Sequence, residues 1–356
     1  MKSLLYIFLI PLIFFSCKNA ADESSQKETK YGGTLKINEA GILRTIYPPA
    51  VEDNISLHIV FQVYEGLVKY DTKDLSKILP AIAREWDIDS TNTIYTFHLN
   101  DSIYFHDDDC FEGGKGRKVT AEDFKYTFEL LCTNTKDNKN FKVMDNVIGA
   151  RQYYEASISG KPDLDIEGIK VINEMTLQIT IENPNPLFIY FMANPAASLL
   201  AREAVEKYGN KTTVGTGPFK IKKLPENNEP LYLVRNKKYS NKDKNGGKLP
   251  YLDTIKVSFI SSTQKELTMF EEGDLDIVFG LPGDYIPKFL DKHIDKFESN
   301  PPQYILHPEE KSTDIYSLLQ SRINGFYTNS QNYLDLSIIY FEEPKAYVEK
   351  NEKPVQ

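Results

Sequence analysis

The spacing of apolar side chains along the chain predicts both strands and helices. Leu35 and Ile37 alternate with polar residues, as do the apolar residues of 95–99, and a period of two is typical of strands with one buried face. Apolar residues recur at helical spacing over 55–67. A Thr-Ala-Glu-Asp capping box opens a second helix, over 120–131. Strands and helices that interleave in this way indicate an α/β protein.

The middle of the chain predicts a strand–helix–strand unit. Residues 166–171 and 177–181 are two strands separated by a polar turn, and we expect them to pair with each other. Residues 255–279 have the order strand, helix, strand, with Thr263 and Glu266 as a capping box for the helix. Such a unit places its two strands parallel, so we expect a parallel or mixed sheet.

Beyond residue 306 the apolar pattern weakens. Residues 317–323 are expected to form a short helix, and residues 334–341 a strand. The final residues are charged, and we expect them to be loosely held.

The N-terminal residues have the order of a bacterial secretion signal. A positive start precedes the apolar run Leu4–Phe15, which is followed by the small residue Ser16 and then by Cys17. The run is shorter than the roughly 20 apolar residues that span a bilayer. The segment resembles a lipobox, which predicts a signal peptide over 1–16, a lipid on Cys17 and a polar tether over 17–30. The alternative is an uncleaved N-terminal anchor with an incidental thiol.

Composition restricts the class of partner. The net charge of -9 argues against a nucleic-acid partner, which would require clustered Lys and Arg. The chain contains 22 Tyr and 20 Phe, whose large apolar faces suit either a binding protein or simply a core. Its length allows one large two-lobed unit or two ordinary domains.

Motifs of catalysis and metal binding are missing from the sequence. There is no Gly-x-Ser-x-Gly, no His-Glu-x-x-His and no Cys-x-x-Cys, and the glycine-rich stretch 113–117 lacks the spacing of a phosphate loop. We therefore expect no catalytic residue, no metal ligand and no cofactor. Cys110 and Cys132 form an even pair in an exported protein, which favours a disulfide, although two separate buried thiols are the alternative.

A series of short phrases, in a fixed order, resembles the extracellular solute-binding proteins of family 5, the dipeptide, oligopeptide and nickel binders of ABC importers. The resemblance covers residues 31 to about 306. No single phrase decides it, but their order and spacing together do. The phrases are Gly32-Gly33-Thr34-Leu35, Tyr64-Glu65-Gly66-Leu67, Leu79-Pro80-Ala81-Ile82-Ala83-Arg84-Glu85-Trp86, Ile103-Tyr104-Phe105-His106-Asp107, Val119-Thr120-Ala121-Glu122-Asp123-Phe124, Gly215-Thr216-Gly217-Pro218-Phe219 and Glu272-Gly273-Asp274-Leu275-Asp276.

The resemblance implies an α/β fold of the periplasmic-binding-protein type II class, with two lobes joined by a hinge. The first lobe would comprise 31–254, built from 31–49 and 193–254, with an inserted subdomain over 50–192. The second lobe would begin at 255–306, followed by the unmatched tail 307–356.

The resemblance also implies a substrate-binding lipoprotein without catalysis. Its ligand would be a peptide or another small solute, and its partners would be ABC permease subunits and, through the lipid, the membrane. The chain would be a monomer in the bacterial cell envelope, outside the cytoplasm. By position in the family, the expected ligand-binding residues are Glu39, Ala40, Gly41, Ile42, Leu43, Arg44, Phe141, Gly280 and Leu281.

Two departures from the family pattern bear on these expectations. The usual Phe-His-Asp-Gly turn is expanded here into Asp107–Lys118. Family members usually continue for some two hundred residues beyond the Gly-Asp-Leu-Asp phrase, whereas nothing after Leu306 matches. We therefore expect an incomplete second lobe; the alternative is a short but complete relative. An incomplete chain could instead act as a cell-envelope interaction protein that binds no ligand tightly.

Overall fold

A computed structural model describes residues 31–226, 229–308, 315–327, 329 and 333–342. The predictions for the signal peptide, for Cys17 and for the tether lie outside the described residues. The helices are α1 Asn54–Val63, α2 Ala121–Leu131, α3 Ala150–Ala156, α4 Phe188–Met192, α5 Arg202–Tyr208, α6 Thr263–Glu271 and α7 Ile286–Glu298. The strands are β1 Thr34–Glu39, β2 Val68–Asp71, β3 Asp74–Pro80, β4 Ala83–Ile88, β5 Ile94–Leu99, β6 Ile169–Asn173, β7 Thr176–Thr180, β8 Phe219–Ile221, β9 Leu231–Arg235, β10 Thr254–Phe259, β11 Ile277–Pro282, β12 Tyr304–Pro308, β13 Ile315–Gln320, β14 Ile323–Asn324 and β15 Tyr340–Phe341.

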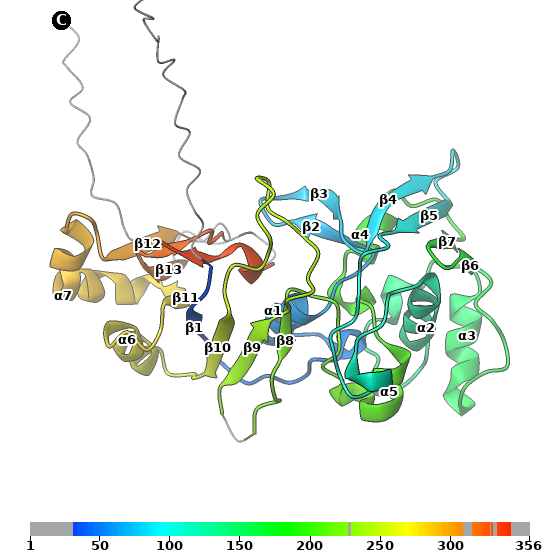
Figure 1. Cartoon of the computed structure of the whole chain (residues 1–356), viewed down its shortest axis with the longest axis horizontal. Coiled ribbons are helices and arrows are strands. Elements are labelled where there is room, and N and C mark those ends of the chain that lie inside the picture. The colour runs from blue at the N-terminus through cyan, green and yellow to red at the C-terminus, as the bar shows by residue number, and fades with distance from the viewer. Residues whose placement is uncertain (1–30, 227–228, 309–314, 328, 330–332, 343–356) are drawn as a thin grey trace, which may run out of the picture.

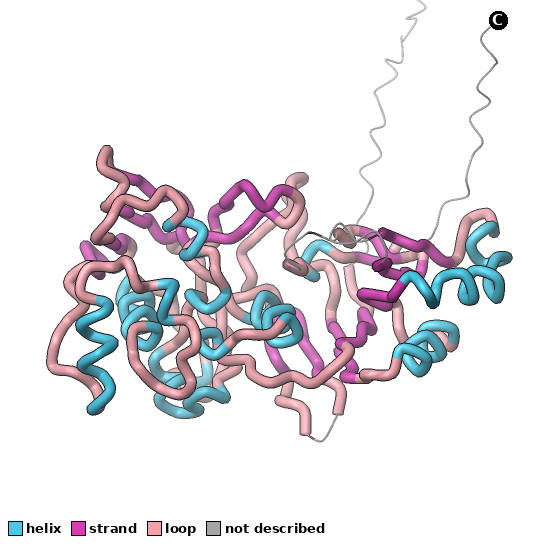
Figure 2. Tube along the Cα trace, turned by 180° about the vertical axis from the view of Figure 1, so that it is seen from behind, coloured by secondary structure: helices cyan, strands magenta, loops and turns pink. Residues whose placement is uncertain are grey.

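A seven-stranded mixed sheet lies at the centre of the molecule, in the order β12-β13-β11-β1-β10-β9-β8. Strand β1 is parallel to both of its neighbours, β10 and β11, whereas the outer strands run antiparallel. The predicted strand–helix–strand unit is therefore confirmed, with β1 inserted between its two strands. Seen from behind, helices lie at both ends of the molecule and the central strands lie between them (Figure 2).

The helix of this unit begins where the pattern indicated, but its cap is different. Ser262, not Thr263, is the N-cap, and its side chain accepts a hydrogen bond from the backbone N–H of Lys265. The predicted pairing of Thr263 with Glu266 in a capping box is wrong, because the Glu266 side chain turns into the protein and bonds Asn38 instead.

Between β3 and β8 the chain forms a four-stranded antiparallel sheet, β4-β5-β7-β6, with α2 and α3 beside it (Figure 1). The predicted pairing of the strands around 166–171 and 177–181 is confirmed. The capping box of α2 is also present, with Thr120 and Asp123 bonded reciprocally. Phe124, Phe128 and Leu131 of this helix are fully buried in one apolar cluster with the sheet.

The helix expected over 317–323 is wrong, because these residues belong mainly to strand β13. This strand lies between β11 and β12 and is covered on both faces. Leu318 packs in the cluster under α6 and α7, and its neighbour Leu319 packs in the cluster around β1. The strand expected over 334–341 is reduced to the two residues of β15, after a 3-10 turn at Leu336–Ile338.

Residues 333–341 pack against β1 and α1. Leu334, Leu336 and Ile339 are buried in the same cluster as β1 and α1. Gln62 of α1 donates a hydrogen bond to the backbone O of Leu334 and accepts one from the N–H of Leu336. The C-terminal residues therefore cover apolar surface that would otherwise face solvent.

The predicted disulfide is not formed, since Cys110 and Cys132 are both free cysteines. The expanded loop is held at the start of α2, where Arg117 pairs with Asp123 at 2.6 Å. Cys132 is the C-cap at the other end of this 11-residue helix. At 1.5 Å per residue the two ends of α2 are roughly 16 Å apart.

Candidate functional site

A cavity opens at the carboxyl end of β1, beside β11, α1 and α6. Ligands of α/β proteins commonly bind outside the carboxyl ends of parallel strands. The cavity has a volume of about 290 Å³, and we call it the cleft pocket. Its described lining comprises Asn38, Glu39, Ala40, Asn54, Ile55, His58, Glu266, Phe279, Gly280, Phe326, Tyr327, Asn329, Tyr333 and Leu334.

The polar floor of the cleft pocket is a set of side chains held by hydrogen bonds. Glu39 Oε1 lies 2.8 Å from His58 Nδ1, which joins the end of β1 to α1. Asn38 Nδ2 donates to Glu266 Oε1 at 2.9 Å and to the backbone O of Ile260, whose N–H donates back to Asn38 Oδ1. Burial, together with the nearby charge of Glu39, raises the pKa of Glu266 to about 7.

The structure brings three of the predicted ligand-binding residues together in this pocket. Glu39 and Ala40 reach it from the end of β1, and Gly280 reaches it from β11. Gly280 has a φ of 62°, a left-handed conformation that glycine adopts without strain.

The other predicted residues lie outside the pocket lining. Ile42 is 62% exposed, and Leu43 packs against the cluster around β1. Leu281 is buried in the cluster under α6 and α7. Phe141 stacks on Tyr154, with ring centroids 4.0 Å apart. Gly41 and Arg44 are likewise absent from the lining.

Sequence reasoning missed the partners that α1 and α6 contribute. His58 lies on the helix predicted from its apolar spacing and belongs to no motif, whereas Glu266 was assigned to a capping box. Both side chains lie on the helix faces that contact the end of β1, and this position is the signal that could have identified them. That signal becomes visible only once β1 is known to lie between β10 and β11.

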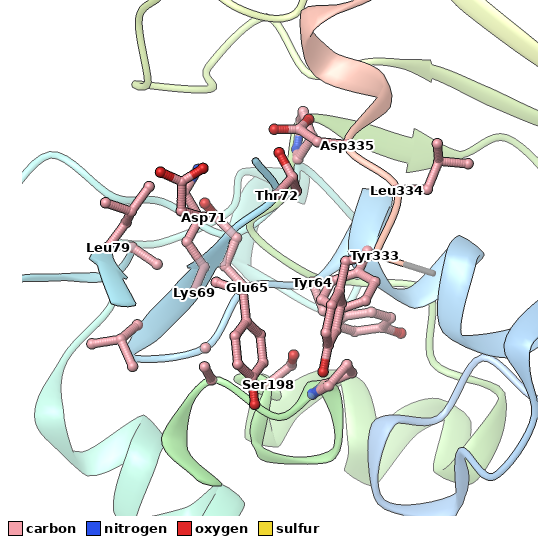
Figure 3. A pocket seen from close by; sticks show the side chains of 18 of the residues that line it. Tyr64, Glu65, Lys69, Asp71, Thr72, Leu79, Ser198, Tyr333, Leu334 and Asp335 are labelled. Carbon is pink, nitrogen blue, oxygen red and sulfur yellow. The ribbon is translucent and has the colours of Figure 1, made fainter. Parts of the chain in front are cut away.

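A second pocket adjoins the first and is shown in Figure 3. We call it the aromatic pocket, because the rings of Phe61, Tyr64, Tyr70, Tyr239 and Tyr333 line it. The two pockets share Tyr333 and Leu334. Tyr333 stacks on Tyr70 with ring centroids 4.6 Å apart and meets Phe61 edge-on at 4.7 Å. The ring of Tyr333 therefore stands between the two pockets.

Glu65 places a half-buried side chain at the wall of the aromatic pocket (Figure 3). It accepts hydrogen bonds from Thr216 Oγ1 at 2.8 Å and from the Tyr239 hydroxyl at 3.2 Å. Burial raises the pKa of Glu65, although the bond from Thr216 and the charge of Lys69 act in the opposite direction. Glu65 therefore links the phrase Tyr64-Glu65-Gly66-Leu67 to the phrase that contains Thr216, and its hydrogen bonds have a structural role.

The Gly-Thr-Gly-Pro phrase is explained by close backbone packing beside this pocket. A Cβ at Gly215 would lie 2.0 Å from the backbone O of Val63, a distance that no side chain tolerates. His106 is buried against the same loop, since its Nε2 lies 2.9 Å from the O of Gly217 and its Nδ1 accepts from the N–H of Gly215. Burial lowers the pKa of His106 to about 4, so the ring is neutral.

Comparison of the chain with known proteins identifies its relatives. The family profile described as bacterial extracellular solute-binding proteins, family 5 Middle, matches residues 77–316. The periplasmic oligopeptide-binding protein OppA of Salmonella typhimurium is 25% identical over 276 residues, which cover 76% of this chain and 47% of that protein. The periplasmic murein peptide-binding protein MppA of Escherichia coli is 29% identical, over 69% of this chain and 43% of that protein. The chain thus spans about half the length of the curated relatives it matches.

Solved structures show the same fold. A periplasmic oligopeptide-binding protein of Borrelia burgdorferi superposes with a TM-score of 0.64 at 25% identity, over 78% of this chain and 51% of that chain. The periplasmic binding protein DppA of Helicobacter pylori, in complex with the peptide STSA, superposes with a TM-score of 0.62 at 21% identity, over 78% and 50% of the two chains.

Proposed function

The chain belongs to the bacterial extracellular solute-binding proteins of family 5, and on this premise we propose that it binds a peptide or a related small solute in the cleft pocket for an ABC importer. Its fold is the α/β type II fold of periplasmic binding proteins. The observation that carries the proposal is the meeting of Glu39, Ala40 and Gly280 in one cavity, at the carboxyl end of β1 and beside β11. In this role the protein makes and breaks no bond.

The proposal includes an extracytoplasmic location and a lipid anchor on Cys17. Support comes from the apolar run before Cys17 and from the periplasmic relatives. Within the part of the chain that the structure describes, no helix has the length and apolar character to cross a bilayer. An anchored monomer would remain close to its permease, which raises the effective concentration of one for the other.

Ligand binding is tested by isothermal titration of the purified chain with a mixed library of short peptides. Saturable heat is expected, and mass spectrometry of the native protein would identify a ligand that co-purifies. The matched variants are Ala40→Trp, which fills the cleft pocket, and Ile42→Trp, which adds the same ring to the exposed part of the same loop. Ala40→Trp should abolish binding while Ile42→Trp retains it. Equal binding by both variants would place the ligand elsewhere, and no binding by the native chain would refute the proposal.

A further inference from the structure

We propose that a lysine-rich pocket beside Tyr31 docks on the anionic headgroups of the bilayer that holds the chain. The inference rests on the anchor at Cys17 that the proposed function includes, and it adds the face of the molecule that lies against the lipid. It follows from the charges of this pocket and from its place next to the first described residue.

The pocket lies at the amino end of β1, opposite to the cleft pocket. Its volume is about 750 Å³, and we call it the basic pocket. Tyr31 lines it just before β1 and Thr254 lines it at the start of β10, whereas the cleft pocket lies at the carboxyl end of β1. The basic side chains of its lining are Lys220, Arg235, Lys237, Lys238 and Lys248.

The basic pocket carries an excess of positive charge in an acidic protein. Its lining has five Lys or Arg against two Asp, whereas the whole chain has a net charge of -9. Both Asp residues are already paired, one with Arg235 at 3.2 Å and the other with Lys238. Lys237 and Lys248 are exposed and make no ion pair within the part of the chain that the structure describes. These two lysines can therefore meet an external anion.

The positive charge continues onto one face of the central sheet. Lys36 of β1 pairs in register with Lys256 of β10, and the pocket residue Thr254 lies on the same face as Lys256. These side chains alternate with Leu35 and Ile255, which are fully buried on the other face. Lys36 and Lys256 are half-buried, and neither pairs with a carboxylate in the described ranges. The basic surface thus extends from the pocket across two strands.

The position of Tyr31 selects a membrane as the partner that carries the anions. Tyr31 is 50% exposed, and its ring centroid lies 5.6 Å from Cζ of Arg235. The 14 residues of 17–30 span at most about 50 Å even when fully extended. A lipid on Cys17 would therefore keep the basic pocket near a bilayer surface, where tyrosine is itself enriched.

The kind of contact also favours a bilayer over a small soluble anion. Lys237 and Lys248 are exposed side chains, so a single contact to either is screened by water and salt and contributes little. A bilayer presents many phosphates in one plane, and several such contacts then form together. Basic residues near an anionic lipid surface add to one another in this way.

The test uses the full acylated chain, inserted into preformed vesicles of phosphatidylcholine alone or of equal parts phosphatidylcholine and phosphatidylglycerol. A lysine-acetylating reagent is added, and mass spectrometry follows the rates at which Lys237 and Lys248 react. Both should react at least about fivefold more slowly on the anionic vesicles, because one basic residue near an anionic surface already changes the equilibrium by about this factor. Salt at about 1 M should restore both rates, since it reduces the Debye length to about 3 Å. Lys170 of β6 is exposed and outside the pocket, so its rate should not change.

A charge reversal within the pocket supplies the matched variants. Lys237→Glu should speed the reaction of Lys248 on anionic vesicles at least about fivefold, whereas Lys170→Glu makes the same change in β6 and should leave it slow. Equal rates of Lys237 and Lys248 on both kinds of vesicle overturn the inference. Slow reaction in native membranes but not on anionic vesicles also overturns it, and assigns the pocket to a protein partner.

The anchor and the peptide site are checked separately. Intact mass shows whether Cys17 carries acyl chains, and without them the inference falls together with the proposed anchor. If Lys237 and Lys248 stay reactive on anionic vesicles although the chain is acylated and binds peptides, the inference fails while the proposed function stands.

Discussion

Asn38 of β1 and Glu266 of α6 are joined by a hydrogen bond of 2.9 Å across 228 residues of sequence. The same Asn38 side chain exchanges two bonds with the backbone of Ile260, at the end of β10. Two strand ends and one helix are therefore fixed at a single point on the floor of the cleft pocket. The Glu266 carboxyl is part of this junction, and its protonation should affect folding as well as binding.

Glu266→Gln should stabilise the protein, and more so at alkaline pH. The folded-state pKa of about 7 lies above the ordinary value of 4.5, so the native state holds the proton more tightly than the unfolded chain. The contribution of Glu266 to stability is therefore complete below pH 4.5 and is lost as the pH rises toward 7, by ~3 kcal/mol in total. The neutral amide has no such loss. Thermal unfolding at pH 5 and pH 8 measures the difference, with Glu272→Gln as the control that should show none.

His106 should give the protein a loss of stability in mild acid. Its folded-state pKa of about 4 lies below the ordinary 6.5, so the unfolded chain binds the proton more readily. The contribution of the neutral His106 ring to the free energy of unfolding is complete above pH 6.5. It is lost as the pH falls toward 4, by ~3 kcal/mol. Urea unfolding across this range should show the fall in the native chain and a smaller one in His106→Gln. His98→Gln, at an exposed ion pair with Asp87, should behave like the native chain, and an unchanged slope in His106→Gln would contradict the assignment.

Leu336→Ala should destabilise the fold by about 3 kcal/mol, because Leu336 is 1% exposed and packs against the cluster around β1. Urea unfolding measures the change. Ile305→Ala is the control, since Ile305 is 39% exposed and its truncation should cost little. A Leu336→Ala variant as stable as the native chain would show that the C-terminal residues are dispensable for this core.

Both internal cysteines should remain reduced. Cys110 and Cys132 are free in the structure, and burial raises the pKa of both thiols, which slows their oxidation. Under denaturing conditions, intact-mass measurement after alkylation should show both thiols labelled without prior reduction. A mass two units below that of the reduced chain, with no label at either cysteine, would show that the disulfide forms.

Cys17→Ser should release the protein from membranes. Acyl chains contribute ~0.8 kcal/mol per buried methylene, so two or more chains anchor a protein stably. Cell fractionation followed by immunoblotting checks the distribution. A variant that stays with the membranes would refute lipid attachment at Cys17.

Much of the fold could be predicted from local signals. Leu35 and Ile37 alternate with polar residues because their face of β1 is buried. Thr120 with Asp123 marks the start of α2 by local sequence alone. Glu39, Ala40 and Gly280 were placed at the ligand site by resemblance alone, and the structure brings these three together.

The remainder depends on contacts between distant segments. Leu318 and Leu319 are adjacent, yet each packs in a different cluster, so β13 lacks the alternation that distinguishes a strand from a helix. Glu266 appeared to be a capping residue because its partner Asn38 lies far away in sequence. Tyr333 belongs to no regular element, and its place between the two pockets follows only from its stacking on Tyr70.

The central position of β1 has a consequence for the order of folding. Thr34 pairs with Thr254, so the first strand to be synthesised waits about 220 residues for its partner. At roughly 5–20 residues per second this delay is on the order of ten to forty seconds. A strand with unpaired edges is a hazard for aggregation during such an interval. In the proposed extracytoplasmic role the same delay would be useful, because a chain that cannot complete its central sheet early stays unfolded long enough to be threaded through a membrane.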